Sequence, residues 1–566
     1  MGRKKQIYLR IAIAIIAGFA LTGWLSSEKG KEQLDYLGKV HQNIIFFGKV
    51  YKEVANKYID VIDPEKFMNL GLDAMLAAVD DYTVLVEGEE NAQLEIMTTG
   101  RYGGLGMVIG IREKWPTVME PPYDDTPALR AGCREGDQII EVDGISTENM
   151  TVNDVAKHMR GEIGTAVNIS IRRAGSDQPI NFRLVRAEIV VKDVVFSEVI
   201  ADSVGYIKLS RFSKNAVHEV RKSVLDLKNK GMKNLILDLR NNPGGLLESA
   251  VGVADIFLAK GRLIVSTKGR TPATMQKYYS ENDPILVNEP LVILVNRFSA
   301  SASEIVAGAI QDLDRGIILG QTTFGKGLVQ SIIQLNRNSR LKLTTAKYYL
   351  PSGRLIQRDR RTPKEKEKIL FSAAERQSRK DDSLKVYSTT IGREVHGRGG
   401  IVPDMVIAAD SLTGYQQSLL RQSMIFNYAV DFINTLEQVN KIPEVTDAVL
   451  ADFELFLQQR KFKYESESYK KLTELKNILK VEGYLDKTQP QMASLDTAIN
   501  NLFADEFSKN KDFIQHQLNL ELAAKYGGTQ AKIRIGLTKD EELKKALNLL
   551  QNLPEFSSIL QPESEI

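Results

Sequence analysis

The chain has 566 residues, of which 43% are hydrophobic and 26% charged, and its 75 basic and 72 acidic side chains leave a net charge of +3. Domains usually contain roughly 100 to 200 residues, so this length predicts three or four globular domains. Charges of both signs are interleaved along the chain, so a nucleic-acid partner is not expected. The single cysteine, Cys133, excludes an internal disulfide and is interpreted as a buried apolar residue, and no CxxC or HExxH spacing predicts a zinc site.

The amino terminus differs from the rest of the chain. Three basic residues at positions 3–5 precede an apolar run from Ile11 to Leu25, which is the pattern of a targeting segment. An uncleaved signal anchor and a cleaved signal peptide both fit residues 1–27, and the anchor is favoured because no A-x-A-like cleavage site precedes Ser26. Positive residues on the amino side predict that the remainder is extracytoplasmic, in the periplasm or cell envelope, either anchored to the membrane or secreted.

Two patterns follow in chain order. Apolar residues recur at helical spacing from Leu34 to about Val86, with Asp63-Pro64 opening a second run, which predicts a helical segment over residues 28–90. From Tyr102 the pattern changes to short β-type runs punctuated by glycine, which predicts a compact β-rich module over residues 91–188. These runs are Gly106–Ile111, Thr117–Glu120, Gln138–Val142, Val167–Ile171 and Ile180–Val185.

Beyond Val190 strands alternate with helices, which predicts an α/β core with a largely parallel sheet over residues 189–415. Within the core, residues 356–398 are crowded with charge and are interpreted as a solvated insertion. Helical periodicity over residues 416–566 predicts an all-α C-terminal domain without visible chemistry. The core strands are expected at Gly205–Leu209, Leu235–Leu239, Leu291–Val295 and Ile317–Leu319, with one helix capped by Ser213 and another from about Ser301.

A serine-rich segment lies between a predicted buried strand and a helix. Phe298–Glu304 reads FSASASE, and this junction is where α/β folds present reactive side chains. The first turn of a helix also offers free N–H groups and the positive end of the helix dipole, which favour developing negative charge. The alternative is that these serines are merely helix N-caps.

A lysine in a second segment favours catalysis over capping. Thr323–Gln330 reads TFGKGLVQ and places Lys326 between two glycines at the entry to a β run. Serine needs a base to take its proton, and no histidine lies in a comparable setting, so Lys326 is the available base and must be neutral to act. Gln330 lies four residues along the same predicted strand, so it should face the same way and hydrogen-bond the amine.

A third segment, Leu237–Leu247, is a buried strand that breaks into a Pro-Gly-Gly turn and then a helix. Paired glycines permit backbone N–H groups to point at a ligand oxygen, as an oxyanion hole requires. Taken alone, this turn could also be an ordinary connection between a strand and a helix.

The order NNPGG, SASASE, TFGKGLVQ, KYYLPSGR and GGIVPD, over roughly Leu70 to Ile407, closely resembles that of the C-terminal processing peptidases, also called tail-specific proteases. The resemblance implies a crotonase/ClpP-like α/β core. It also implies that Ser301 is the nucleophile, Lys326 the base and Gln330 its partner.

The resemblance further implies an oxyanion hole made by the N–H of Ala302 and that of Gly244 or Gly245; spacing does not choose between the two glycines. It identifies the β module as a PDZ domain.

The expected carboxylate-binding loop of that domain is Tyr102-Gly-Gly-Leu-Gly106, with Gly103, Gly104, Leu105 and Gly106 as tail-binding residues. Successive N–H groups of such a turn form an anion nest, and the adjoining strand edge can pair with an extended tail. Leu105 either enters the tail pocket or packs in the core of the module.

The sequence therefore predicts an extracytoplasmic serine endopeptidase that recognises substrate tails through the PDZ domain and forms an acyl-enzyme on Ser301, without metal, nucleotide or other cofactor. Its expected partners are proteins or peptides with free C-terminal tails and, through the amino-terminal segment, the membrane; a homo-oligomer or an adaptor stays open. Two alternatives are a non-catalytic PDZ scaffold, which the complete Ser301, Lys326 and Gln330 argue against, and a crotonase-type acyl-CoA enzyme. The secretory amino terminus disfavours the latter, because CoA substrates are cytoplasmic.

Overall fold

The computed structural model describes residues 28–201, 203–336, 338–358, 385–397, 399–408, 411–435, 441–464, 466–503 and 505–561. The chain divides into two compact units, residues 1–79 and 80–566. The predicted targeting segment and most of the predicted charged insertion lie outside the described residues. Among the helices that are described, none combines the length and the apolar character needed to cross a membrane.

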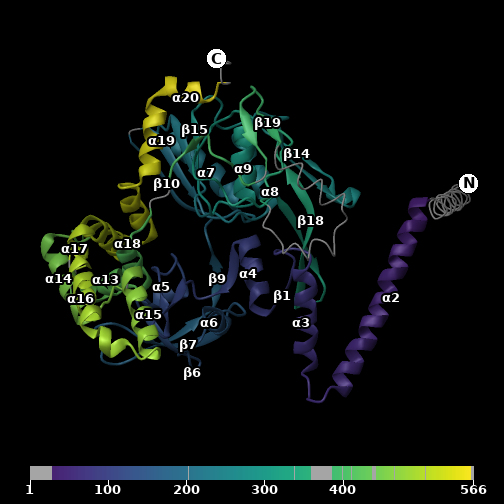
Figure 1. Cartoon of the computed structure of the whole chain (residues 1–566). Helices are drawn as coiled ribbons and strands as arrows, with labels where there is room; N and C mark the ends of the chain where they lie inside the picture. Colours follow the sequence, from purple (N-terminus) through teal and green to yellow (C-terminus); the bar gives the residue numbers. More distant parts are fainter. Residues whose placement is uncertain are drawn as a thin grey trace, which may run out of the picture. The chain divides into compact units, whose positions relative to one another are not determined.

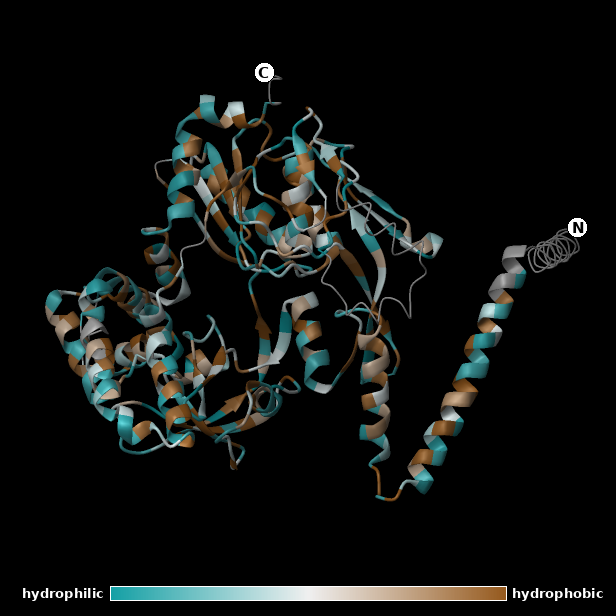
Figure 2. Cartoon of the chain, viewed as in Figure 1, coloured by the Kyte–Doolittle hydropathy of each residue, from teal (hydrophilic) through white to brown (hydrophobic). Residues whose placement is uncertain are grey.

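The described part of the first unit contains two helices, α2 (Glu28–Lys57) and α3 (Pro64–Ala77). The side chain of Asp63 accepts hydrogen bonds from the first turn of α3, so the chain breaks at Asp63-Pro64 as the sequence predicts. The rings of Tyr51 and Phe67 stack with their centroids 5.5 Å apart. Figure 2 shows hydrophobic and hydrophilic residues alternating along α2.

The second unit contains a six-stranded core sheet with the order β10-β11-β12-β15-β16-β21. β10 pairs antiparallel with β11, and the other neighbours pair in parallel. The predicted α/β core with a largely parallel sheet is therefore confirmed. Its strands are β10 (Val194–Ile200), β11 (Val204–Leu209), β12 (Asn234–Asp238), β15 (Leu291–Val295), β16 (Ile317–Gly320) and β21 (Met405–Val406).

Helices cover both faces of this sheet (Figure 1). One face packs Leu235 and Leu237 against α7 (Ala216–Asn229), α8 (Leu247–Asp255) and α9 (Ala302–Asp312). On the other face, Ile236 and its neighbours belong to a cluster with the C-terminal helices α19 (Glu541–Gln551) and α20 (Leu553–Ile559). The helices α19 and α20 thus complete the hydrophobic core of this sheet.

A second sheet of five strands includes the strand that follows Lys326. One of them, β1 (Val84–Glu87), lies where helical spacing was predicted, so that prediction is wrong for these four residues. Four residues are too few to distinguish helical from strand spacing, and pairing with β18 makes them a strand. The other strands are β13 (Leu263–Gly269), β14 (Lys277–Tyr279), β17 (Leu328–Gln334) and β18 (Ser339–Tyr349).

The predicted β module forms between α4 (Gly88–Thr99) and β10. Its strands surround a core that contains Leu105, Ile139 and Val155. The elements are β2 (Arg101–Gly104), β3 (Ile109–Arg112), β4 (Trp115–Val118), α5 (Pro127–Ala131), β5 (Gln138–Val142), β6 (Ile145–Ser146), α6 (Val152–Met159), β7 (Ala166–Arg172), β8 (Ile180–Val185) and β9 (Ala187–Val190).

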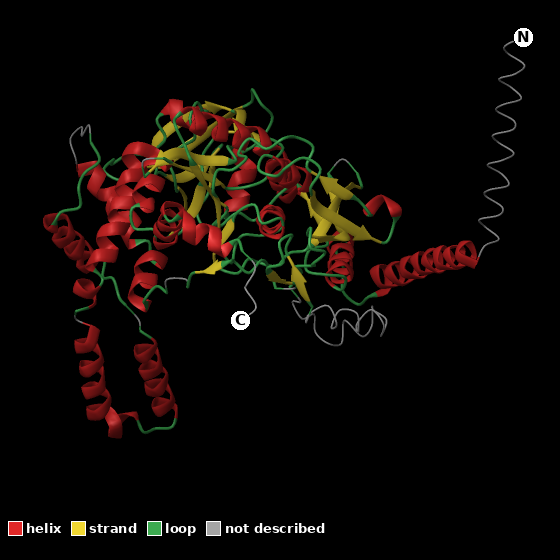
Figure 3. Ribbon diagram, turned by 90° about the horizontal axis from the view of Figure 1, so that it is seen from above, coloured by secondary structure: helices red, strands yellow, loops and turns green. Residues whose placement is uncertain are grey.

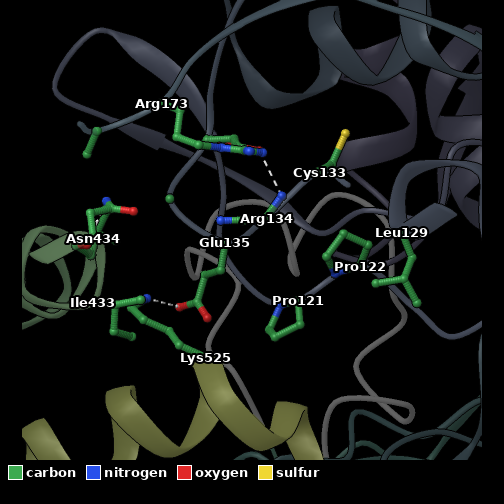
Figure 4. A pocket seen from close by; sticks show the side chains of 14 residues that line it. Pro121, Pro122, Leu129, Cys133, Arg134, Glu135, Arg173, Ile433, Asn434 and Lys525 are labelled. Carbon is green, nitrogen blue, oxygen red and sulfur yellow. Dashed lines mark hydrogen bonds and ion pairs between the residues drawn. The ribbon is translucent and has the colours of Figure 1, made fainter. Parts of the chain in front are cut away.

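The C-terminal region is helical as predicted, which completes the mixed α/β fold seen in Figure 3. It contacts the β module through a buried ion pair between Glu135 and Lys525, 2.8 Å apart (Figure 4). It contacts the core through Arg240, which binds Asp540 and Glu542. Its earlier helices are α12 (Gly414–Arg421), α13 (Met424–Thr435), α14 (Asp447–Gln459), α15 (Glu467–Val481), α16 (Leu485–Phe503), α17 (Glu506–Lys509) and α18 (Lys511–Leu537).

Candidate active site

Ser301 lies in the sharp turn that joins β15 to α9. Its φ of 54° and ψ of −110° fall outside the regions that residues with a Cβ ordinarily adopt, so the turn is strained. Contacts on both sides hold this conformation: its N–H donates to Glu304 Oε2 at 2.8 Å, and its carbonyl accepts from Tyr348 Oη at 3.2 Å. The strain is thus maintained by the surrounding core.

The two neighbouring serines are fully buried. Ser299 Oγ donates to the carbonyl of Leu239 at 2.8 Å, and Ser303 Oγ donates to the carbonyl of Asn242 at 2.9 Å. Both carbonyls belong to the loop that follows β12, so these hydroxyls join the two loops. Of the three serines, only Ser301 lines the large cavity at this edge of the core.

Glu304 joins the serine turn to the lysine loop. Its fully buried carboxyl group accepts hydrogen bonds from the N–H groups of Ser301, Gly325 and Lys326 at 2.7–2.9 Å, and from Thr323 Oγ1 at 2.5 Å. Burial raises the pKa of this carboxyl group, whereas the four donors favour its charged form. The carboxylate therefore sets the spacing between the loops that carry Ser301 and Lys326.

Lys326 lies just before β17 rather than inside it, and a bulge separates Val329 from Gln330. The predicted contact nevertheless forms: Lys326 Nζ donates to Gln330 Oε1 at 3.0 Å. The two side chains do not meet through the predicted strict alternation along one strand. The loop before β17 and the bulge within it bring them together. Burial, and then the charge of Lys342, lowers the pKa of Lys326 to about 8.

Ser301 and Lys326 line the same cavity of 690 Å³, which also receives residues from α4, α8, β17 and β18. Within the described residues, no hydrogen bond joins the Ser301 hydroxyl to the Lys326 amine. Catalytic hydrogen bonds are often long or absent in unliganded enzymes and tighten when substrate binds. The sequence-predicted pair is therefore brought into one cavity, with the amine held by Gln330.

The glycine turn packs directly against the serine turn. A Cβ on Gly244 would lie 2.6 Å from the carbonyl oxygen of Ala300, and its N–H already donates to Asn242 Oδ1 at 2.9 Å. Gly245 lines the cavity instead, and among the described residues no acceptor is recorded for its N–H or for that of Ala302. The geometry thus favours Gly245 over Gly244 as a donor to a bound oxygen.

A second cavity, of 260 Å³, lies in the β module and is lined by Leu105, Gly106 and Met107. Gly103 and Gly104 belong to β2, which pairs with β9, and they do not line this cavity. Three residues of the predicted loop, Tyr102, Leu105 and Gly106, thus line the cavity, and Met107 extends this lining. Leu105 is 2% exposed and belongs to the core of the module while it also lines the cavity.

Two further site residues were not recognised from the sequence. Glu304 stands inside the serine motif, and its position three residues after the cap was a usable capping-box signal. Tyr82 contacts both Lys326 and Gln330, and no local pattern indicates this, because the residues are more than 240 positions apart.

Three family models match the chain. Peptidase family S41 matches residues 203–366, which include the serine, lysine and glycine segments; a PDZ domain matches residues 119–173; and the C-terminal helical domain of a probable PDZ-protease matches residues 415–550. The PDZ match lies within the β module, and the helical match lies within the C-terminal helices.

Curated relatives are similar over a large part of the chain. A carboxy-terminal-processing protease of Bartonella bacilliformis is 35% identical over 62% of this chain and 80% of its own length. A carboxyl-terminal-processing protease of Synechocystis sp. is 37% identical over 50% of this chain and 66% of its own length. The solved structure of a photosystem II D1 C-terminal processing protease has 30% identity, a TM-score of 0.32, and covers 55% of this chain and 89% of that one.

The similarity to the Bartonella bacilliformis protease, over 80% of its length, establishes the family. The PDZ match agrees with the observed β module. The chain belongs to peptidase family S41 and is a carboxyl-terminal processing protease, a serine peptidase with a PDZ domain.

Proposed function

We propose that this protease is an extracytoplasmic endopeptidase that binds the C-terminal tail of its substrate in the PDZ cavity and cleaves through an acyl-enzyme on Ser301. Lys326 acts as the general base. The observation that carries this proposal is one cavity that combines a strained serine with a partly buried amine whose pKa is lowered to about 8. At about pH 7, an amine with this pKa is neutral in roughly one molecule in ten, compared with fewer than one in a thousand for an ordinary lysine.

In the first step, neutral Lys326 accepts the proton of the Ser301 hydroxyl while Ser301 Oγ bonds to the substrate carbonyl carbon. The carbonyl becomes an oxyanion, which accepts hydrogen bonds from the N–H groups of Ala302 and Gly245. Ala302 begins α9, so its N–H also lies at the positive end of the helix dipole.

The tetrahedral species then collapses. The bond between the carbonyl carbon and the leaving nitrogen breaks, and the Lys326 ammonium returns its proton to the leaving amine. A water molecule next attacks the Ser301 ester, with Lys326 again taking a proton, which it passes to Ser301 Oγ as the acid product leaves. Gln330 holds the amine throughout, through its hydrogen bond to Nζ.

Tail capture uses the cavity beside Leu105, Gly106 and Met107. Consecutive N–H groups of this turn suit a terminal carboxylate, and an extended tail can pair with the adjoining strand edge. The side chains of Tyr102 and Tyr123 also line this cavity. We propose that a free carboxylate is required for efficient cleavage.

The location outside the cytoplasm rests on the basic and apolar segment at residues 1–27. Protease added outside intact spheroplasts should digest all of the chain except about the first 25 residues. A full-length soluble cytoplasmic protein would end this part of the proposal.

The chemistry is tested with a serine-directed acylating probe and with matched peptides that end in a free acid or an amide. The probe should modify Ser301, and the peptide amide should be cleaved much more slowly than the acid. Labelling of Ser299 or Ser303 would contradict the assigned nucleophile. Equal cleavage of acid and amide would remove the PDZ cavity from the mechanism, and binding of tails without any cleavage would indicate a scaffold.

A further inference from the structure

The base of this site is contacted by a residue that lies outside the peptidase core. Tyr82 belongs to the turn Asp80–Thr83, which precedes the PDZ domain in the chain. Asp80 Oδ1 accepts from the N–H of Tyr82 at 2.7 Å and from the N–H of Thr83 at 2.6 Å, so the turn has a defined conformation.

The same turn is fixed to the second sheet. Thr83 Oγ1 accepts from the N–H of Thr344 at 3.2 Å, and the following strand β1 pairs with β18 in register from Val84 with Lys342 to Glu87 with Ser339. Thr83 is also buried. The position of Tyr82 is therefore set by contacts on both sides of it.

Tyr82 makes two separate contacts, one with Gln330 and one with Lys326. Its carbonyl oxygen accepts from Gln330 Nε2 at 2.6 Å, and its ring centroid lies 4.9 Å from Lys326 Nζ. The first contact orients the amide of Gln330, because the Nε2 bond to Tyr82 leaves Oε1 for the lysine amine, 3.0 Å away. The second places an aromatic face over that amine.

We propose that Tyr82 is a positioning residue for the general base: its carbonyl orients Gln330, and its ring limits the access of water to the amine of Lys326. This inference rests on the proposed Ser301 and Lys326 chemistry. The segment that supports Lys326 and Gln330 would then lie before the PDZ domain in the chain and would pack on the peptidase core through β1.

Charged side chains on three elements influence the pKa of the Lys326 amine. Lys342 on β18 disfavours the charged amine, whereas Glu304 on α9 and Asp80 in the Tyr82 turn favour it. Burial is the largest cause of the lowered pKa of Lys326. The ring has two opposite effects on this pKa: its face attracts the charged amine, which raises the pKa, and it excludes water, which lowers the pKa. We expect the second effect to be larger, so loss of the ring should raise the pKa of Lys326.

The test measures kcat/KM against pH for the full chain and its Tyr82→Ala variant with a free-acid peptide. The midpoint of the alkaline rise should move upward by about one pH unit, which gives a roughly tenfold loss near pH 7 that largely disappears above both midpoints. All three variants keep the backbone carbonyl that binds Gln330, and Tyr82→Phe also keeps the ring, so it should restore the wild-type midpoint. Tyr82→Val, which removes the ring with a smaller loss of volume, should shift the midpoint in the same direction as alanine.

A midpoint does not depend on the fraction of enzyme that is folded, so partial unfolding would lower the whole curve without moving it. Tyr484→Ala, an exposed aromatic residue in the C-terminal region, serves as the matched control and should leave the midpoint unchanged. An unchanged midpoint in both the alanine and valine variants would overturn the role of the Tyr82 ring. Full activity of Ser301→Ala and Lys326→Ala would instead overturn the proposed chemistry beneath it.

Discussion

Ser301 and Lys326 line one cavity, but different parts of the chain hold them. The turn of Ser301 is surrounded by buried core contacts from Asn242, Glu304 and Tyr348. The amine of Lys326 is held by Gln330, whose own partner is the carbonyl of Tyr82, a residue that precedes the PDZ domain.

This difference separates what is rigid in the site from what can be adjusted. The serine turn packs against the glycine turn so closely that a Cβ on Gly244 would lie 2.9 Å from Ser301 Cβ. The pKa of the Lys326 amine depends on its burial and on neighbouring charges. The fraction of neutral base can therefore change while Ser301 stays in place. Substitutions on the two sides should therefore have different signatures.

The largest effect is expected at the nucleophile. Ser301→Ala should lower kcat by about 10⁴-fold or more, because no other group can form the acyl-enzyme. Its thermal unfolding midpoint should stay close to that of the wild type, since this hydroxyl lines the cavity and does not join two buried loops as those of Ser299 and Ser303 do. Retained hydrolysis by the purified variant would refute the assignment.

Replacement of the base comes next. Lys326→Arg should lower kcat/KM by about 10³-fold, because a guanidinium stays protonated and cannot accept the serine proton. In the wild type, the lysine pKa of about 8 predicts that kcat/KM rises with pH below about pH 8 and levels off above it. A flat profile between about pH 6 and pH 9 would show that Lys326 is not the titrating base.

Glu304 should affect both sides of the comparison. Glu304→Gln places an NH₂ group among four donors, so at least one buried donor loses its acceptor, and we expect about 2 kcal/mol of lost unfolding free energy. Activity should fall by about 10-fold to 100-fold, since the serine and lysine loops lose their common anchor. Denaturant unfolding and steady-state kinetics on one preparation measure both losses. A variant that loses neither would contradict the bridging role.

Gln330→Ala should slow the reaction by about tenfold without preventing acylation by a serine-directed probe. The amine loses its hydrogen-bond partner, but Ser301 and its strained turn are untouched. Burst kinetics that resolve acylation from deacylation would show whether both steps slow, as expected because Lys326 acts in each. Loss of probe labelling would mean that Gln330 also supports the serine turn.

The smallest catalytic effect is expected at Ser303. Ser303→Ala removes one donor to the buried carbonyl of Asn242, which still accepts from the N–H of Ala300, so the loss should be about 0.5 to 1.5 kcal/mol of unfolding free energy. Activity of the folded fraction should stay within about twofold of the wild type, because the hydroxyl does not line the cavity. Ser303→Ala thus contrasts with Ser301→Ala: one lowers stability, and the other removes catalysis.

The sequence by itself determined the α/β core, the β module, the helical C-terminal region and the candidate residues Ser301, Lys326 and Gln330. The fold and the reactive segments follow from local signals: periodicity reports burial on one face, and small residues at strand ends mark turns that can hold a reactive group. The choice of Ser301 among three serines came from the resemblance to the C-terminal processing peptidases. Glu304 was within reach of the same reasoning, since a carboxylate three residues after a cap is a local pattern.

The tertiary structure decided what depends on contacts between distant residues. Val84–Glu87 became a strand because β18 pairs with it. Gly245 lines the cavity, whereas the N–H of Gly244 already donates to Asn242 Oδ1. The cover of Lys326 by Tyr82 joins positions 244 residues apart in the sequence. Burial and hydrogen-bond partners of this kind set the pKa of the amine, and no periodicity along the chain encodes them.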